Sequence, residues 1–240
     1  MSKELDTCSE KISFSASDDW DLIQIIAHQL SSRDPRIQVK ELVDNALDAF
    51  SRMNFSPLDG KQVKVIIRKK DKRNPHIKIV DNGPGWEPHK SSTDNLLGFP
   101  NFEYTVKHIG DSIKKKHAEF TKASAEGRAV GQFAIGLFSF WALGDRLTIY
   151  SRSLLEKGKN GPCSKMIWLK EVRDAEIVHN VDPPVELLNK AGSVVIIDQL
   201  QKAQMNPITG NILTTYLSRA CRTVLMKNPD IELSIDDHGT

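Results

Sequence analysis

The chain has 240 residues, of which 39% are apolar and 27% charged, and its formal net charge is +2. This composition provides enough apolar material for a sizeable core, and the small net charge argues against a bulk polyanion as partner. The cysteines, Cys8, Cys163 and Cys221, are widely spaced, which favours reduced thiols in a cytoplasmic compartment over disulfides or a metal site. The N-terminus has no signal segment, and the most apolar run, 133–143, is too short for a membrane span. We therefore expect a soluble chain with no membrane partner.

Helices are expected early in the chain, after a first strand. Apolar and polar residues alternate over 11–16, which predicts that strand. Ser17 is suited to cap a helix. Pro35 is placed to begin a second helix that runs to about Met53. One face of the first helix would carry the apolar side chains Trp20, Ile23, Ala27 and Leu30.

Two strands are predicted next, at 63–68 and 76–80. The basic cluster 68–73 lies between them, and we interpret it as a solvated hairpin tip rather than a nucleic-acid surface, because no aromatic residue is interleaved with its charges. From about 86 to 130 the pattern becomes irregular and is broken by glycine and proline. A long irregular segment inside a compact domain is typical of a functional lid.

The second half of the chain is expected to consist mainly of paired strands. Together with the earlier elements, this predicts an α+β sandwich, with one mixed, mostly antiparallel sheet and helices packed on one face. The elements expected here are a buried helix at 131–143, strands at 146–152, 165–170 and 193–198, an amphipathic helix at 211–227 and a short strand at 231–235.

Four short patterns could carry chemistry, although each has an ordinary structural explanation when taken alone. On a helix, Glu41, Asn45 and Asp48 would share one face, opposite an apolar stripe. A polar cluster of this kind is costly to bury, but it could also be a solvated face. The expected apolar stripe consists of Leu42, Ala46, Ala49 and Met53.

The other three patterns are rich in glycine. A strand ends in Asp81 and is followed by a turn with Gly83 and Gly85, and glycine allows a backbone to approach a ligand closely. The segment 131–136 opens a helix, where backbone N–H groups can bind an anion. Ser193 follows a glycine at the start of a strand. A simple turn, an ordinary helix start and an ordinary strand start would explain these patterns one by one.

In this order and spacing, the four patterns together resemble the ATP-binding domain of the GHKL superfamily, which includes gyrase, heat-shock chaperones, histidine kinases and MutL. The matching motifs are Glu-x-x-x-Asn-x-x-Asp-Ala, Asp-x-Gly-x-Gly, a variable lid, Gly-x-x-x-x-Gly and Gly-Ser, and they cover residues 11–200. The resemblance implies a Bergerat-type sandwich that uses ATP and Mg²⁺. Ala134, where the heat-shock chaperones have glycine, is a departure, and Asn82 and Pro84 are more similar to sensor kinases or type IIB topoisomerases.

The resemblance also implies roles for individual residues. Glu41 would polarise the attacking water, and Asn45 would coordinate Mg²⁺. Asp81 would accept a hydrogen bond from the adenine amino group, and Ser193 would help to hold Asp81 and the base. Lys114 would reach the phosphates from the lid, with Lys115 and Lys116 as rival candidates. Further nucleotide-binding residues would be Asp48, Gly83, Gly85, Gly131, Gln132, Phe133 and Gly136.

Hydrolysis is favoured over two alternatives. Histidine-kinase catalytic domains usually carry asparagine at the position of Glu41, so Glu41 and Asp48 favour an ATPase. A non-hydrolysing, nucleotide-gated interaction module is the other alternative. We expect an ATP-binding domain over 1–200 and a C-terminal helix and strand over 201–240 that lead toward a further domain. The family would make this an ATP-gated homodimeric clamp within a longer protein, weak as an ATPase alone, with DNA or protein as its client.

Overall fold

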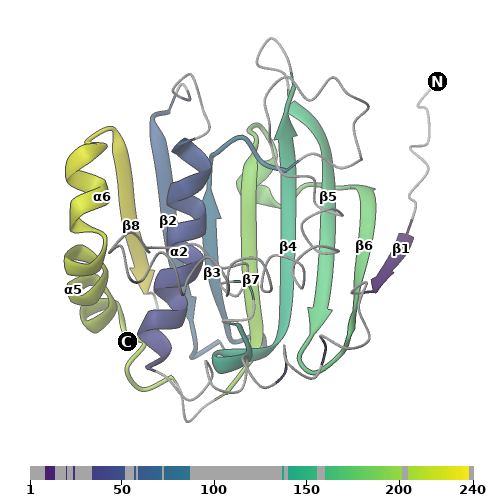
Figure 1. Cartoon of the computed structure of the whole chain (residues 1–240), viewed down its shortest axis with the longest axis horizontal. Coiled ribbons are helices and arrows are strands. Elements are labelled where there is room, and N and C mark those ends of the chain that lie inside the picture. The colour runs from purple at the N-terminus through teal and green to yellow at the C-terminus, as the bar shows by residue number, and fades with distance from the viewer. Residues whose placement is uncertain are drawn as a thin grey trace, which may run out of the picture.

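The computed structural model describes residues 9–13, 20, 24, 34–51, 57, 59–71, 73–86, 137, 140–155, 160–201 and 205–237. Its strands are β1 (Ser9–Ser13), β2 (Lys61–Arg68), β3 (His76–Asp81), β4 (Gly144–Leu154), β5 (Asn160–Leu169), β6 (Asp174–Val181), β7 (Gly192–Leu200) and β8 (Ile231–Asp237). They form one eight-stranded sheet in the order β1-β6-β5-β4-β7-β3-β2-β8 (Figure 1). Every pairing is antiparallel except that of β2 with β8.

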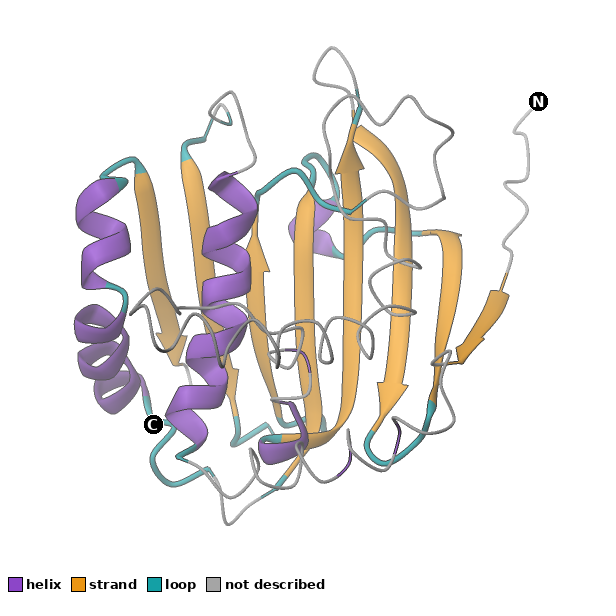
Figure 2. Ribbon diagram, in the orientation of Figure 1, coloured by secondary structure: helices purple, strands orange, loops and turns teal. Residues whose placement is uncertain are grey.

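The helices of the described residues are α2 (Pro35–Ser51), α5 (Gly210–Ala220), α6 (Arg222–Lys227) and the short 3-10 helix η4 (Val185–Leu187). In Figure 2, α2 crosses one face of the sheet and α5 and α6 lie beside it. We call this the inner face. It carries the main core, which includes Phe140, Trp141 and Trp168, all fully buried. The opposite, outer face carries a small second cluster that includes Leu187 of η4. The expected α+β sandwich is confirmed.

Helix α2 begins where the sequence predicts. The Asp34 carboxylate accepts a hydrogen bond from the backbone N–H of Arg36 at 2.9 Å, so Asp34 caps the helix and Pro35 occupies its first position. The buried stripe of α2 is wider than expected. Leu42 and Ala46 are in the core, but Ala49 is only half-buried and Met53 lies outside the described residues. The remaining buried apolar residues of the helix are Val39, Val43, Leu47 and Phe50.

The basic cluster at 68–73 lies in the turn between β2 and β3, as expected for a hairpin tip. Lys70 and Arg73 are exposed, but Lys69 is not a simple solvated charge. Its ammonium group donates to the carbonyl of Ile208 at 2.8 Å and to that of Met205 at 3.3 Å. Lys69 therefore ties the hairpin to the segment that leads into α5.

Strand β6 was not predicted from the sequence. Its inward-facing residues alternate as a strand requires, with Ala175 and Ile177 fully buried, but the next one is the polar His179. His179 is buried because its ring nitrogen Nδ1 lies 2.9 Å from the hydroxyl of Ser164 on β5. This polar pair hides the apolar alternation by which a strand is recognised.

The prediction of a single helix at 211–227 was wrong, because the structure has two helices separated at Cys221. Within α5, the Thr215 hydroxyl donates to the carbonyl of Asn211 at 3.0 Å, and the Ser218 hydroxyl donates to that of Thr215 at 3.1 Å. Hydroxyls that bond back to the preceding turn bend and weaken helices. Cys221 is buried and has a non-helical ψ of 2°, which interrupts the regular helix before α6 begins.

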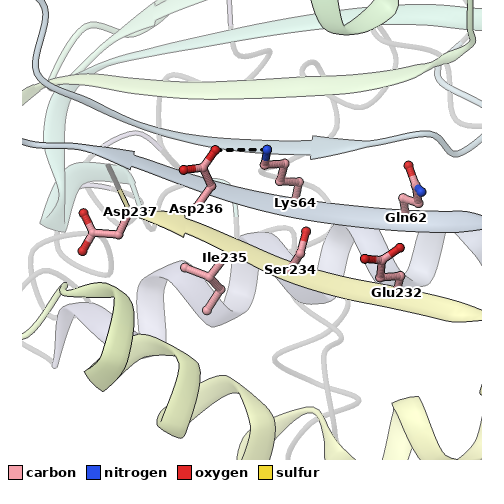
Figure 3. A pocket seen from close by; sticks show the side chains of 7 residues that line it. All are labelled: Gln62, Lys64, Glu232, Ser234, Ile235, Asp236 and Asp237. Carbon is pink, nitrogen blue, oxygen red and sulfur yellow. Dashed lines mark ion pairs between the residues drawn. The ribbon is translucent and has the colours of Figure 1, made fainter. Parts of the chain in front are cut away.

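Strand β8 completes the sheet beside β2. On the outer face, Lys64 of β2 pairs with Asp236 of β8 at 3.0 Å, and Arg68 pairs with the same carboxylate at 3.2 Å. Figure 3 shows Lys64 and Asp236 joined across the two strands, whereas Ile235 points toward the helices. At the end of β8, the Asp237 carboxylate accepts a hydrogen bond from the backbone N–H of Gly210 at 2.6 Å, so it caps the start of α5.

The cap supplied by Asp237 gives a testable prediction. Asp237→Ala removes the acceptor at the start of α5, and we expect it to lower the free energy of unfolding by about 1 kcal/mol. Asp230→Ala is the matched control, since Asp230 is exposed and its pair with Lys61 should contribute little. The measurement is the urea midpoint of each variant. Equal midpoints for the two variants would show that Asp237 does not act as a cap.

Candidate functional site

The site is built around Asp81, the last residue of β3. This strand is hydrogen-bonded to β2 on one side and to β7 on the other, and Asp81 is paired directly with Ser193 of β7. Because β3 is interior to the sheet, its end is enclosed, and the Asp81 side chain is only 5% exposed. The sequence motif therefore places a carboxyl group in the interior of the molecule.

Three groups support this buried carboxyl. The backbone N–H of Gly83 donates to its Oδ1 at 2.9 Å, and Ser193 contributes hydrogen bonds from its backbone and its side chain. Burial nevertheless dominates and raises the pKa of Asp81 to about 7, while the hydrogen bonds and the charge of Lys190 act in the opposite direction. Asp81 can therefore change its protonation state near neutral pH, which the sequence did not reveal.

Gly83 packs closely between Asp81 and helix α2. A Cβ atom at this position would lie 2.9 Å from Asp81 Oδ1 and 3.3 Å from the Cβ of Ala49 on α2. A side chain at position 83 would therefore collide with the carboxyl group and crowd the helix. Gly85 has a φ of 67°, and a Cβ there would lie 2.1 Å from the carbonyl oxygen of Arg152, so the turn can pass β4 only with glycine.

Helix α2 brings a polar face to the same region. Glu41 is half-buried, whereas Asn45 and Asp48 are exposed, and the three side chains follow one face of the helix as expected. The neighbouring Lys40 is engaged by Asp44 in an ion pair on the next turn. Burial opposes the charge of Lys40, but Asp44, with a smaller contribution from Glu41, raises its pKa.

The structure thus brings Asp81, Gly83 and Ser193 together and places Ala49 of the Glu41 helix beside them. The roles proposed for these residues stay predictions. The lid expected at 86–130 lies outside the described residues except for Trp86, and so does the phosphate-binding segment. The expected site residues in these parts are Lys114, Gly131, Gln132, Phe133 and Gly136, and the rival lysines Lys115 and Lys116 lie there too.

Asn82 has a structural role that the sequence reasoning missed. Its amide oxygen accepts a hydrogen bond from the backbone N–H of Gln62 at 2.7 Å, and its amide nitrogen donates to the carbonyl of Gly60 at 2.7 Å. These bonds fix the turn after Asp81 to the start of β2. The Asn-Gly pair had indicated only a turn. On β4, the Ser151 hydroxyl similarly accepts a hydrogen bond from the backbone N–H of Trp86 at 2.7 Å.

Comparison with known proteins finds relatives among chaperones. "Chaperone protein HtpG" of Wigglesworthia glossinidia brevipalpis is 25% identical over 166 residues, which are 67% of this chain and 24% of the relative. The protein of the same name from Colwellia psychrerythraea is 28% identical over 160 residues, which are 61% of this chain and 22% of the relative. The one from Klebsiella pneumoniae is 28% identical over 154 residues, which are 58% of this chain and 22% of the relative. The chain spans about a quarter of the length of these relatives. No family model matches the chain.

Among the described residues, no helix is both long and apolar enough to cross a membrane. Within the same part of the chain, no group of three or more His, Cys, Asp and Glu side chains is arranged to hold a metal ion. Cys163 and Cys221 are free and buried, as expected of reduced thiols, and burial raises the pKa of each to about 11.

The raised pKa of Asp81 predicts how stability depends on pH. An unfolded aspartate titrates near pH 4, whereas the folded group titrates at about 7, so the folded chain binds the proton more tightly. The resulting stabilisation is fully present below about pH 4 and is lost as the pH rises through 7. Each unit of pKa difference corresponds to roughly 1.4 kcal/mol. We therefore expect the ionisation of Asp81 to lower the free energy of unfolding as the pH rises from about 4 through 7.

Urea unfolding at several pH values between 4 and 8 measures the contribution. The neutral variant Asp81→Asn should lack it, because nothing remains to be ionised at this position. Asp71→Asn is the control, since the carboxyl group of Asp71 lies in the exposed turn between β2 and β3. This variant should keep the pH-dependent contribution of Asp81. If Asp81→Asn retains the full pH dependence of the parent chain, the buried carboxyl does not titrate as described.

Proposed function

We propose that this chain binds Mg·ATP and hydrolyses it slowly, as an ATP-gated clamp within a longer protein. The observation that carries the proposal is the buried carboxyl of Asp81, held by hydrogen bonds from Gly83 and Ser193 beside the helix that carries Glu41 and Asn45. The sequence resemblance to the GHKL superfamily and the similarity to HtpG chaperones support it. The similarity to HtpG favours the heat-shock chaperone branch of the superfamily over its kinase branch.

Asp81 is suited to read the base. An ionised carboxylate only accepts hydrogen bonds, and the adenine amino group is a donor. A guanine would present an oxygen at the same position, so its lone pairs would face those of the carboxylate. A site built to receive a donor rejects a ligand that lacks one, because its buried acceptor is left unpaired. Ser193 and the Gly83 N–H would hold the carboxyl group in place for this contact.

The exposed face of α2 is suited to the phosphate end of the nucleotide. Asn45 offers an amide oxygen, which Mg²⁺ accepts as a ligand, and Mg²⁺ commonly uses only one or two protein ligands beside water and phosphate. Bound there, the ion would spread the charge of the phosphates. Glu41 lies one helical turn before Asn45 and would orient the attacking water. Asp48 would complete this polar face.

The remaining parts of the proposal come from the resemblance. Residues 131–136 would cradle the phosphates, and Lys114 would reach them from a lid that closes over the nucleotide. Closure would pair two copies of the longer protein, and hydrolysis would release them. The chaperone relatives favour a protein client, and the scattered cysteines favour a cytoplasmic location.

Two substitutions should separate binding from hydrolysis. Asp81→Asn should weaken ATP binding at least tenfold by calorimetry, because a charged hydrogen bond contributes about 1.5–3 kcal/mol. Glu41→Ala should keep the ATP affinity within a few-fold but remove most phosphate release, because Glu41 acts chiefly in the transition state. Asp44→Asn is a matched control from the same helix. Its carboxylate pairs with Lys40, and its loss should leave hydrolysis largely intact.

Parental phosphate release from Glu41→Ala would show that another residue orients the water. If the unmodified chain binds ATP without any phosphate release, the chain is a non-hydrolysing, nucleotide-gated module. If Asp81→Asn binds ATP as tightly as the parent chain, the proposed base contact is wrong.

A further prediction concerns the longer protein. The 240 residues alone should bind ATP as a monomer and turn over well below the roughly 1–1000 per second of typical enzymes. A chain of the relatives' length should dimerise with a non-hydrolysable ATP analogue and hydrolyse ATP faster, because a second domain would add charge-stabilising contacts to the γ-phosphate. Sedimentation with and without the analogue, beside a phosphate-release assay, measures both. Equal rates for the two lengths would contradict the clamp.

A further inference from the structure

Arg152 of β4 binds three backbone carbonyls from two other segments of the chain, close to Asp81. Its Nε donates to the carbonyl of Gly161 at 3.1 Å, and its Nη1 donates to the carbonyl of Leu187 at 2.8 Å and also to that of Leu188. These acceptors are backbone oxygens, on β5 and at the end of η4. A guanidinium with several donors in a fixed plane is suited to bridge such groups.

The Arg152 side chain lies on the outer face of the sheet. Side chains alternate along β4, and Leu147 and Ile149 belong to the inner core, which places Ser151 on the inner face and Arg152 on the outer. Its partner Leu187 is fully buried in the outer cluster. Helix α2, which carries the proposed phosphate-binding face, packs on the inner face. Arg152 is therefore separated by the sheet from the proposed nucleotide.

The segment that Arg152 anchors leads directly into the site. Residues 189–191 connect Leu188 to Gly192, which is paired with Arg152 across the sheet. Gly192 has a φ of 140°, and a Cβ there would lie 2.1 Å from the carbonyl oxygen of Asp81. The next residue, Ser193, hydrogen-bonds the Asp81 side chain. The path of this segment thus fixes the donor that orients the carboxyl group.

The backbone of Arg152 constrains the other side of Asp81 as well. The Arg152 carbonyl oxygen lies where only a glycine at position 85 leaves room. Two residues further along β4, the N–H of Leu154 donates to the carbonyl of Pro84 at 2.9 Å. The turn after Asp81 and the strand beside it are therefore both held at one point of β4.

We propose that Arg152 is a positioning residue that sets the base selectivity of the nucleotide site from the opposite face of the sheet. The proposal rests on the proposed function. Without the guanidinium, the carbonyls of Gly161 and Leu187 lose their donor, and the segment before Ser193 is free to shift. A carboxyl group that Ser193 no longer orients would discriminate poorly between an amino group and an oxygen on the base. A lysine in place of Arg152 would keep the charge but could not bridge all three carbonyls.

The test compares Arg152→Met, Arg152→Lys and Arg146→Met. Arg146 is the matched control, because it lies on the same face of the same strand and its guanidinium binds Asp198 of β7 with three hydrogen bonds of 2.7, 3.0 and 2.6 Å. Both methionine variants should lower the stability. Dissociation constants for ATP and GTP are measured at a temperature where circular dichroism shows every variant to be folded.

Arg152→Met should reduce the preference for ATP over GTP about tenfold, equivalent to ~1.4 kcal/mol. The preference of Arg152→Lys should lie between those of Arg152→Met and the parent chain, and Arg146→Met should keep the parental preference. A purely structural role of Arg152 would lower the stability without changing this ratio. An unchanged ratio in Arg152→Met, or an equal loss in Arg146→Met, would overturn the proposal.

A second readout does not require nucleotide. Carbon NMR of the side-chain carboxyl follows the titration of Asp81 in the free protein. Release of the segment would move Lys190 and Ser193 away, and both lower the pKa of Asp81, so Arg152→Met should raise it and Arg146→Met should not. If the parent chain fails to bind ATP, the proposed function is wrong, and this titration alone decides whether Arg152 positions Asp81. An unchanged titration in Arg152→Met would then overturn the inference.

Discussion

The burial of one carboxyl group is the constraint on which the rest of the site depends. Taking a carboxylate out of water is costly unless hydrogen bonds or charges compensate. Asp81 receives support from the Gly83 N–H, from Ser193 and from the charge of Lys190, yet burial still raises its pKa to about 7. The compensation is partial, so the group is held at the point where an additional donor would favour its ionised form. A ligand with an amino group at this position would supply such a donor.

The supports of Asp81 come from parts of the chain that are far apart in sequence. Gly83 lies two residues after it, but Lys190 lies just before β7 and Ser193 belongs to β7. The central location of β3 makes this possible, because an interior strand has neighbours on both sides. The glycines around Asp81 are required for a common steric reason. A side chain at position 83 would collide with the Asp81 carboxyl group, and one at position 85 or 192 would collide with the backbone of Arg152 or Asp81.

Much of the fold could be predicted from the sequence, because local signals are strong where a single rule applies. Pro35 and the apolar periodicity located α2, and alternation located most strands. Strand β6 was missed because the polar His179 interrupts its apolar face. The burial of His179 depends on its hydrogen bond to Ser164, which belongs to another strand. The break at Cys221 was missed because hydroxyl groups that look neutral in a helix bond back to its carbonyls.

The candidate site shows the same division. Asp81, Gly83 and Ser193 were proposed from their order and spacing, and the structure brings them together. The raised pKa of Asp81, the amide bonds of Asn82 to the start of β2 and the bridge made by Arg152 could not be predicted. They depend on the register between strands, which no short segment of sequence specifies.

The parallel pairing of β2 with β8 has a consequence for how the protein forms. Lys61 lies beside Ile231, so this pairing joins residues about 170 positions apart and closes a very long loop. During synthesis on the ribosome, β2 emerges long before its partner. Until β8 arrives, the edge of a strand rich in Val and Ile stays open to pairing with other chains. The nascent chain therefore exposes an unpaired strand edge, a template for aggregation, in the interval between the synthesis of these two strands.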